Sequence, residues 1–195
     1  MTKTSIVLTG VGGHGVITAA NILGKAAINA GVNVFVSEVH GMAQRGGSVN
    51  CAIRMGDVSG PLVASGAADA IIGTEPVETL RCVHYSNKKT KIITDITPLI
   101  PFTVSIGSEK YPDINQIFKE IEKYGKLYKI DAVKIAKDAG NLIVKNIVML
   151  GALSALDILP FKKEILLQTI LENVPNKYKD MNKKAFENGY NAIKK

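Results

Sequence analysis

The sequence predicts an α/β protein with a three-layer α/β/α sandwich, a mainly parallel β-sheet and a helical C-terminal part. Two observations lead to this expectation. Short apolar runs rich in β-branched residues alternate with helix-like segments through the first hundred residues, and from about residue 141 the apolar residues recur at helical spacing. The length of 195 residues suits a single domain, which we expect to span residues 1–195.

The first elements form a strand–helix–strand unit. Residues 5–9, SIVLT, are typical of a buried strand, and residues 17–30, ITAANILGKAAINA, place apolar residues three and four apart. One face of that helix can therefore pack on a sheet. We expect Gly31 to end the helix and residues 32–38 to form the next strand. The crossover of such a unit is right-handed.

The later elements follow from the same alternation. Further strands are expected at residues 49–56, 69–74, 91–95, 103–107 and, as an edge strand, 127–131. Thr74 is expected to cap a helix over residues 75–85, because Glu75 and Pro76 are residue types favoured in a first turn. Later helices are expected over residues 114–124, in an apolar stretch capped by Asn141, and around residues 162–173 and 176–193.

Charge and hydropathy exclude several classes of protein. The net charge is +7, but the lysines are scattered among acidic residues without the interleaved aromatic side chains of a single-strand binder. We therefore expect no nucleic-acid partner. No apolar run approaches the roughly 20 residues that a membrane span needs, and the N-terminal residues lack a signal-peptide pattern. The expected location is the cytoplasm, with no membrane contact.

The two cysteines, Cys51 and Cys82, show no spacing typical of metal ligands. We expect both to be buried free thiols in a reducing compartment. Iron–sulfur clusters usually take four cysteine ligands, so any cluster must lie on another chain. His40 and His84 also lack acidic or thiol neighbours at ligand spacing, and no metal site is expected.

Gly10, Gly12 and Gly15 form a GxGxxG pattern between the first strand and the first helix. Glu38 follows 23 residues after Gly15, where an acid can bind a ribose, so one interpretation is a stand-alone Rossmann-type NAD(P)-dependent reductase. A second interpretation is that the glycines only make tight turns. His14 inside the loop and a second glycine loop at residues 40–48 favour a third, a surface shared by two loops.

Four motifs, taken in order, carry a family resemblance. They are GVGGHGVITAANILGKAA (10–27), SEVHGMAQRGGSV (37–49), ADAIIGTEPVETLR (68–81) and AGNLIVKNIVMLGAL (139–153). Together they resemble the gamma-type subunit or domain of the 2-oxoacid:ferredoxin oxidoreductases, and within that family most closely the beta subunits of indolepyruvate ferredoxin oxidoreductases. The resemblance covers roughly residues 4–160.

The resemblance implies an accessory subunit that is inactive alone. Indolepyruvate members of the family decarboxylate an aryl pyruvate on thiamine diphosphate, pass electrons through iron–sulfur clusters to ferredoxin, and transfer the acyl group to coenzyme A. Thiamine diphosphate, magnesium and the clusters are expected on a large alpha subunit, and ferredoxin is expected to reach the chain only through that complex. Without its partner the chain is expected to self-associate, as a homodimer for example.

The candidate site consists of Gly12, Gly13, His14 and Gly15 in the first loop and Arg45, Gly46, Gly47 and Ser48 in the second. These loops would either bind coenzyme A, because glycine-rich helix starts and arginine suit phosphates, or dock the alpha subunit. The family usually has GGQG where this chain has His14. Both side chains donate and accept hydrogen bonds, but only histidine titrates near neutral pH. His14 is also the one candidate for an acid–base role.

Overall fold

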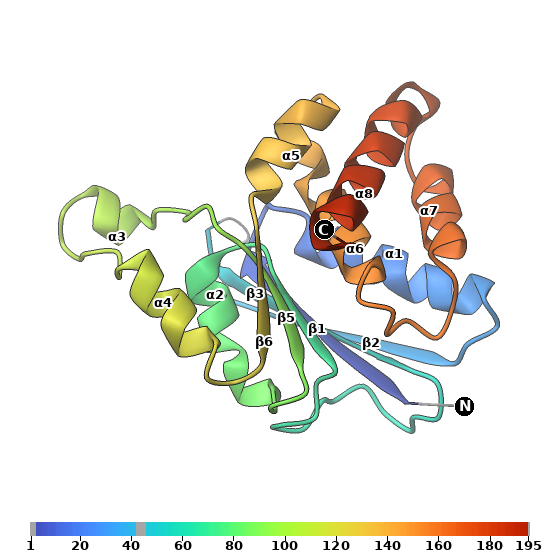
Figure 1. The fold of residues 1–195 in the computed structure, drawn as a ribbon, viewed down its shortest axis with the longest axis horizontal. Coiled ribbons are helices and arrows are strands. Elements are labelled where there is room, and N and C mark those ends of the chain that lie inside the picture. Colours follow the sequence, from blue (N-terminus) through green and yellow to red (C-terminus); the bar gives the residue numbers. More distant parts are fainter. Residues whose placement is uncertain (1–2, 42–45, 195) are drawn as a thin grey trace.

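The computed structural model describes residues 3–41 and 46–194, and its centre is a mixed β-sheet (Figure 1). In this part of the chain six strands form one sheet in the order β2-β3-β1-β4-β5-β6. Their bounds are β1 (Thr4–Val11), β2 (Val34–His40), β3 (Ser48–Met55), β4 (Ala70–Gly73), β5 (Lys91–Asp95) and β6 (Lys126–Ile130). The strands expected at residues 5–9, 32–38, 49–56, 69–74, 91–95 and 127–131 are confirmed, and β6 is an edge strand.

The sheet is mainly parallel, as predicted, with one exception. β1, β4, β5 and β6 pair in parallel, whereas β3 pairs antiparallel with both β1 and β2. The connection from β2 to β3, residues 41–47, is too short for a parallel crossover, which needs a dozen or more residues. As a result the carboxyl ends of the other strands share one edge of the sheet with the start of β3.

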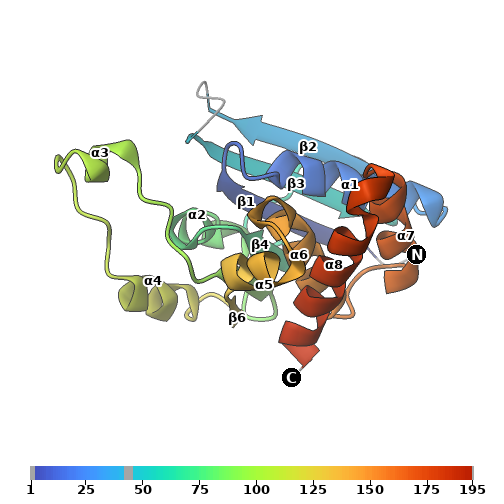
Figure 2. The ribbon, with the colours of Figure 1, turned by 90° about the horizontal axis from the view of Figure 1, so that it is seen from above.

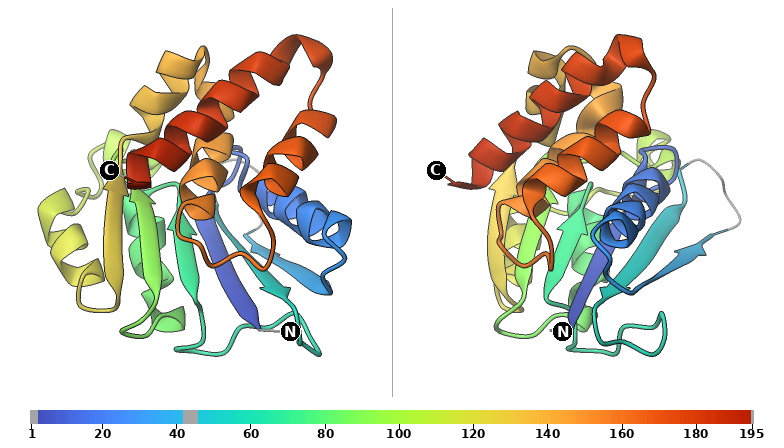
Figure 3. Two further views of the ribbon diagram at one scale, coloured as in Figure 1. Left: turned by 45° about the vertical axis from the view of Figure 1, so that its right-hand side comes forward. Right: turned by 90° about the vertical axis from the view of Figure 1, so that its right-hand side faces the viewer.

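Helices cover both faces of the sheet, which completes the predicted three layers (Figures 1 and 3). One face carries α1 (Val16–Asn29), α5 (Ala132–Ala139), α6 (Lys145–Ser154), α7 (Lys163–Glu172) and α8 (Lys179–Lys194). The other carries α2 (Pro76–Arg81) and α4 (Ile114–Ile121), and the short 3₁₀ helices are η1 (Val83–Tyr85), η2 (Leu142–Val144) and η3 (Asn176–Tyr178). The single turn α3 (Phe102–Ser105) projects away from the sheet (Figure 2).

The first helix, α1, begins and ends as its sequence indicates. Ala20, Leu23 and Ala27 of its apolar stripe are buried against the sheet. At its end Gly31 adopts a φ of 70°. The Gly31 N–H donates to the Ile28 carbonyl at 2.9 Å and the Val32 N–H to the Ala27 carbonyl at 2.9 Å, which is a Schellman motif.

Helix α6 is buried along its whole length between the sheet and α8. Two glycines permit this packing. A Cβ on Gly151 would lie 2.0 Å from the Phe186 carbonyl oxygen, and one on Gly189 would lie 2.1 Å from the Val148 carbonyl oxygen. The backbones of α6 and α8 therefore touch, which fixes the position of α6 over the sheet.

Two local predictions are wrong. Residues 103–107 do not form a strand: the Pro101 carbonyl accepts the amides of Val104 (3.1 Å) and Ser105 (3.0 Å), so the chain makes the helical turn α3, beyond the reach of any strand of the sheet. The cap of α2 is Glu75 rather than Thr74, because the Glu75 carboxylate accepts the amide of Glu78 at 2.9 Å. Asn141 acts as a cap, but of the 3₁₀ turn η2 that leads into α6: its side chain accepts the Ile143 amide at 2.9 Å. Helix α6 itself begins at Lys145, without a side-chain cap.

Cys51 and Cys82 are free and buried, as predicted. Burial, together with the charge of Glu38, raises the pKa of Cys51 to about 12, and burial also raises the pKa of Cys82. Both thiols therefore stay protonated at neutral pH and are poor nucleophiles. In the described ranges, 3–41 and 46–194, no helix is both long enough and apolar enough to cross a bilayer.

Candidate functional site

The two glycine loops lie side by side because β1 and β3 are antiparallel neighbours. Val11, the last residue of β1, pairs with Ser48, the first of β3. Beyond this pair the Gly12 N–H donates to the Gly47 carbonyl at 2.8 Å, and the Gly46 N–H donates to the Gly12 carbonyl at 3.3 Å. The structure thus brings together the two loops that the sequence singled out. Arg45, the remaining candidate, lies outside the described residues.

The first loop needs its glycines for both conformation and space. Gly13 and Gly15 have φ values of 92° and 76°, a region that other residues adopt at a cost. A Cβ on Gly15 would lie 2.8 Å from the Asn146 amide nitrogen, and one on Gly10 would lie 1.9 Å from the Thr74 hydroxyl oxygen. Among residues 3–41 and 46–194 no side chain caps the start of α1, and its first turn holds no acidic residue. The amides of such a helix start suit an anion.

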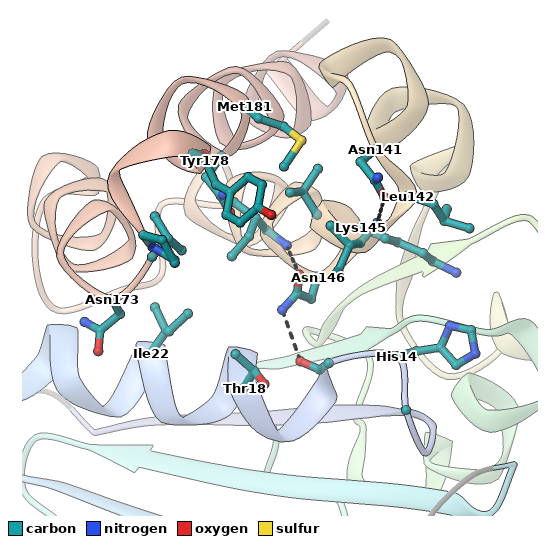
Figure 4. A pocket seen from close by; sticks show the side chains of 18 residues that line it. His14, Thr18, Ile22, Asn141, Leu142, Lys145, Asn146, Asn173, Tyr178 and Met181 are labelled. Carbon is teal, nitrogen blue, oxygen red and sulfur yellow. Dashed lines mark hydrogen bonds between the residues drawn. The ribbon is translucent and has the colours of Figure 1, made fainter.

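Two cavities open on either side of the first loop. One, of about 980 Å³, lies between the two loops, α2 and residues 99–112. The other, of about 720 Å³, lies between the first loop, the start of α6 and the residues around η3 and α8 (Figure 4). Gly13 and His14 line both cavities. His14 therefore stands on the wall that separates them.

Two acidic residues of the α2 segment line the 980 Å³ cavity. The Ser48 hydroxyl donates to the Glu78 carboxylate at 2.5 Å, and Arg81 donates to the other oxygen of that carboxylate at 2.7 Å. Since the Arg81 side chain is 63% exposed, water screens much of its charge. Ser48 therefore holds the second loop against α2.

A buried carboxylate ties residues 99–112 to the sheet. The Tyr111 hydroxyl donates to Glu75, and the Leu99 amide lies 3.5 Å from the same oxygen. Burial, followed by the hydrogen bond to Glu75, raises the pKa of Tyr111 well above its usual range. Sequence reasoning missed Tyr111, because an isolated tyrosine in a loop carries no motif.

Helix α6 reaches the first loop from the other side. The Asn146 amide donates to the Gly15 carbonyl at 3.3 Å (Figure 4). The Lys145 ammonium donates to the Thr74 carbonyl at 2.8 Å. Lys145 also forms an ion pair with Asp95. Burial, and then the charge of Lys145, lowers the pKa of His14. Sequence reasoning missed Lys145; a lysine inside a nearly all-apolar helix was the signal that could have found it.

The structure places Glu38 too far from the first glycine loop to serve as the acid of a dinucleotide site. Glu38 is exposed on β2, and β3 separates that strand from β1. Since neighbouring strands lie about 4.8 Å apart, β2 is roughly 10 Å from the strand that leads into the glycine loop. In a dinucleotide fold the acid follows the neighbouring strand, so the NAD(P) interpretation loses its support from Glu38.

The sequence model of the family described as "Pyruvate ferredoxin/flavodoxin oxidoreductase" matches residues 5–192. A curated relative, "Indolepyruvate oxidoreductase subunit IorB" of Thermococcus kodakarensis, is 45% identical over 197 residues, covering 100% of this chain and 98% of the relative. The match is therefore nearly complete in both directions, and it includes both glycine loops.

Solved structures with the same fold include the gamma subunit of a keto/oxoacid ferredoxin oxidoreductase from Geobacter sulfurreducens. Its TM-score is 0.72 at 24% identity, covering 97% of this chain and 98% of that one. The 2-oxoglutarate:ferredoxin oxidoreductase of Magnetococcus marinus, solved with 2-oxoglutarate, coenzyme A and succinyl-CoA bound, gives a TM-score of 0.76 at 22% identity. This chain matches 31% of that protein's chain over 100% of its own length.

Proposed function

Since the chain belongs to the pyruvate ferredoxin/flavodoxin oxidoreductase family, we propose that it is the small beta subunit of an indolepyruvate:ferredoxin oxidoreductase. The observation that carries the proposal is the 45% identity to a subunit IorB over the whole chain. In this role the chain, acting as one domain, supports the oxidative decarboxylation of aryl pyruvates to aryl-acetyl-CoA in the cytoplasm. Ferredoxin takes the electrons from the partner subunit.

The redox machinery is assigned to the large alpha subunit. Among residues 3–41 and 46–194 no group of three or more His, Cys, Asp or Glu side chains could hold a metal ion. The two thiols are buried and protonated, and so they do not suit a cluster. Thiamine diphosphate, magnesium and the iron–sulfur clusters therefore belong to the partner in this proposal, and no step of the reaction is assigned to residues of this chain.

The contribution of this chain is the edge of the sheet that carries the two glycine loops. Coenzyme A is the first candidate ligand there, because the uncapped amides at the start of α1 suit phosphate groups and Arg45 directly precedes Gly46. The relative from Magnetococcus marinus was solved with coenzyme A bound, which agrees with this assignment.

Docking of the alpha subunit at the same edge is the second candidate. Exposed large apolar side chains lie close to the loops, on the end of β2, at residue 100 and on η2. They are Val39, Ile100, Leu142 and Ile143, each at least 43% exposed. Apolar side chains grouped in this way are typical of a protein–protein contact. In the isolated chain the same edge is the expected site of self-association.

Reconstitution tests the proposal. The chain is purified alone and together with the thiamine-binding subunit from the same genome, and reduction of ferredoxin or a dye is followed with indolepyruvate and coenzyme A. We expect no turnover from the chain alone and turnover from the pair. An alpha subunit that is equally active without this chain would rule the proposal out. Saturable binding of NAD(H) or NADP(H), followed by calorimetry, would instead favour a reductase.

A further inference from the structure

Asn146 joins two parts of the chain that lie 131 residues apart. It is the second residue of α6, and only 8% of its surface is exposed. Its side-chain nitrogen donates to the Gly15 carbonyl at 3.3 Å (Figure 4), and its side-chain oxygen accepts the Ile147 amide at 3.0 Å. A reversed amide would set oxygen against oxygen at Gly15 and N–H against N–H at Ile147. Only one orientation of this side chain therefore satisfies both of its neighbours.

The Gly15 carbonyl lies at the junction between the first loop and α1. It accepts the Ala19 amide at 2.9 Å, which is the first hydrogen bond of the helix, as well as the Asn146 side chain. A carbonyl oxygen has two lone pairs, and these two donors fill them. Because a peptide is planar and trans, a fixed carbonyl also fixes the N–H on its other side. That N–H belongs to Val16, the first residue of α1, and it points out of the helix start.

The first loop needs an anchor because of its glycines. Gly13 and Gly15 have positive φ values and carry no side chain, so little restricts the peptides on either side of His14. On the side of the sheet the loop is held through its backbone, where the His14 amide donates to the Val11 carbonyl at 3.2 Å. On the side of α1 it is held by the Asn146 side chain, which can approach because Gly15 has no Cβ.

Asn146 is carried by a fixed part of the fold. The preceding residue, Lys145, donates to the Thr74 carbonyl at 2.8 Å and forms a buried ion pair with Asp95. The start of α6 is thereby tied to the residue that follows β4 and to the last residue of β5. A side chain on such a base can keep a loop in one conformation instead of following its motion.

We infer that Asn146 is a positioning residue, which holds the Gly15 carbonyl and thereby keeps the first loop in its ligand-binding conformation. The inference rests on the proposed function, in which coenzyme A is the first candidate ligand of this loop. A binding conformation that is populated for only part of the time lowers the apparent affinity by that fraction. Asn146 therefore contributes to binding through Gly15, although it need not touch the ligand.

Hydrogen exchange of the full chain, followed by nuclear magnetic resonance, tests the hold on the loop without any partner. Asn146→Leu keeps nearly the same size and shape and cannot donate a hydrogen bond. We expect the Ala19 amide, whose acceptor is the Gly15 carbonyl, to exchange roughly fivefold faster in this variant. Other buried amides should change less, because the opening is local to the start of α1.

Thr90→Val is the matched control. It removes another buried hydrogen bond to a carbonyl, that of Ala68 at 2.6 Å, at the opposite edge of the sheet from the first loop. In this variant exchange at Ala19 should follow that of the other buried amides. A change at Ala19 in Asn146→Leu no larger than that of the other buried amides would overturn the inference. Where Asn146→Leu fails to fold, Asn146→Ala decides by the same measurement, because it removes the donor without placing an apolar side chain against the loop.

The reconstituted complex supplies a readout that a purely structural role would not move. We expect Asn146→Leu to raise the apparent KM for coenzyme A by up to about fivefold, and to lower turnover at saturating coenzyme A much less. Lower turnover with an unchanged KM would contradict the inference. Absence of turnover with the wild-type chain would contradict the proposed function alone, and the exchange measurement would then decide whether Asn146 holds the loop.

Discussion

The Lys145 ammonium and the Asp95 carboxylate form an ion pair whose side chains are 5% and 0% exposed. Loss of one partner leaves the other charge buried without compensation. We therefore expect Lys145→Met to lower the free energy of unfolding by about 3–5 kcal/mol, measured by urea denaturation. The double variant with Asp95→Asn should lose less than the sum of the two single variants, and additive losses would show that the pair is not coupled. The exposed pair of Lys194 and Asp157, 2.7 Å apart, is the control, and its removal should leave stability nearly unchanged.

Gly15 and Gly46 form a matched pair for testing how tightly the first loop is packed. Both have positive φ, 76° and 79°, but a Cβ on Gly15 would meet Asn146, whereas one on Gly46 would meet no atom of the described residues within 4 Å. Gly46→Ala should cost about 1–2 kcal/mol of unfolding free energy from backbone strain alone. Gly15→Ala should cost more, and Asn146→Ala should recover part of the difference. Equal losses at the two glycines would refute the close contact with α6.

Stability at alkaline pH should depend on Tyr111. Its pKa is raised in the folded chain, whereas the unfolded tyrosine titrates near 10. Above about pH 10 the unfolded state therefore releases a proton that the folded state retains, and the free energy of unfolding falls as the pH rises. Tyr111→Phe should remove this component and should lower stability at neutral pH, because Glu75 loses a hydrogen bond. Urea titrations of wild type and Tyr111→Phe at pH 8 and pH 11 measure this pH-dependent part of the free energy of unfolding. Tyr124→Phe, which changes an exposed tyrosine, is the control. An identical pH dependence in Tyr111→Phe and wild type would exclude the mechanism.

Acidification should destabilise the chain through His14. Its folded pKa is lowered, so below about pH 6.5 the unfolded state binds a proton more readily than the folded state. The free energy of unfolding should then fall as the pH drops from 7 towards 5, and His14→Gln should flatten this part of the curve. A slope unaffected by His14→Gln would show that the ring is not held in its neutral form.

Arg45→Ala tests whether the second loop binds coenzyme A. Loss of one charge-assisted contact to a phosphate group lowers the affinity roughly tenfold. The apparent KM for coenzyme A in the reconstituted enzyme should therefore rise about tenfold. Assembly with the alpha subunit, followed by size-exclusion chromatography, should stay intact. The variant Arg45→Lys keeps the positive charge and should recover part of the lost affinity for coenzyme A. An unchanged requirement for coenzyme A together with weaker assembly would assign the loop to docking instead.

The sequence was sufficient for elements whose signal is local. The stripe of α1, the stop at Gly31 and the strands of the sheet depend on residues within one segment, and each is confirmed. The antiparallel direction of β3 could also have been predicted, because residues 41–47 are too few to form a parallel crossover. The error at residues 103–107 arose because alternation of apolar residues does not show whether a neighbouring strand is available.

Long-range pairs lay beyond sequence reasoning. Lys145 meets Asp95 and Thr74 only because α6 crosses the sheet at the ends of β4 and β5, and no spacing along the chain encodes that crossing. The Tyr111 hydroxyl reaches Glu75 for a similar reason. The glycine loops themselves were identified from their residues, whereas the side chains that hold them became visible only in three dimensions.

The backbone contact between α6 and α8 gives the C-terminal helix an influence on a loop more than 160 residues away. Gly151 and Gly189 let the two helices touch, and α6 in turn presents Asn146 to Gly15. A bulkier residue at Gly189 would displace α6 and, through Asn146, the first glycine loop. The substituted side chain would itself touch none of the candidate residues. Substitutions in α8 can thus change the activity of the complex while every residue of the first glycine loop stays the same.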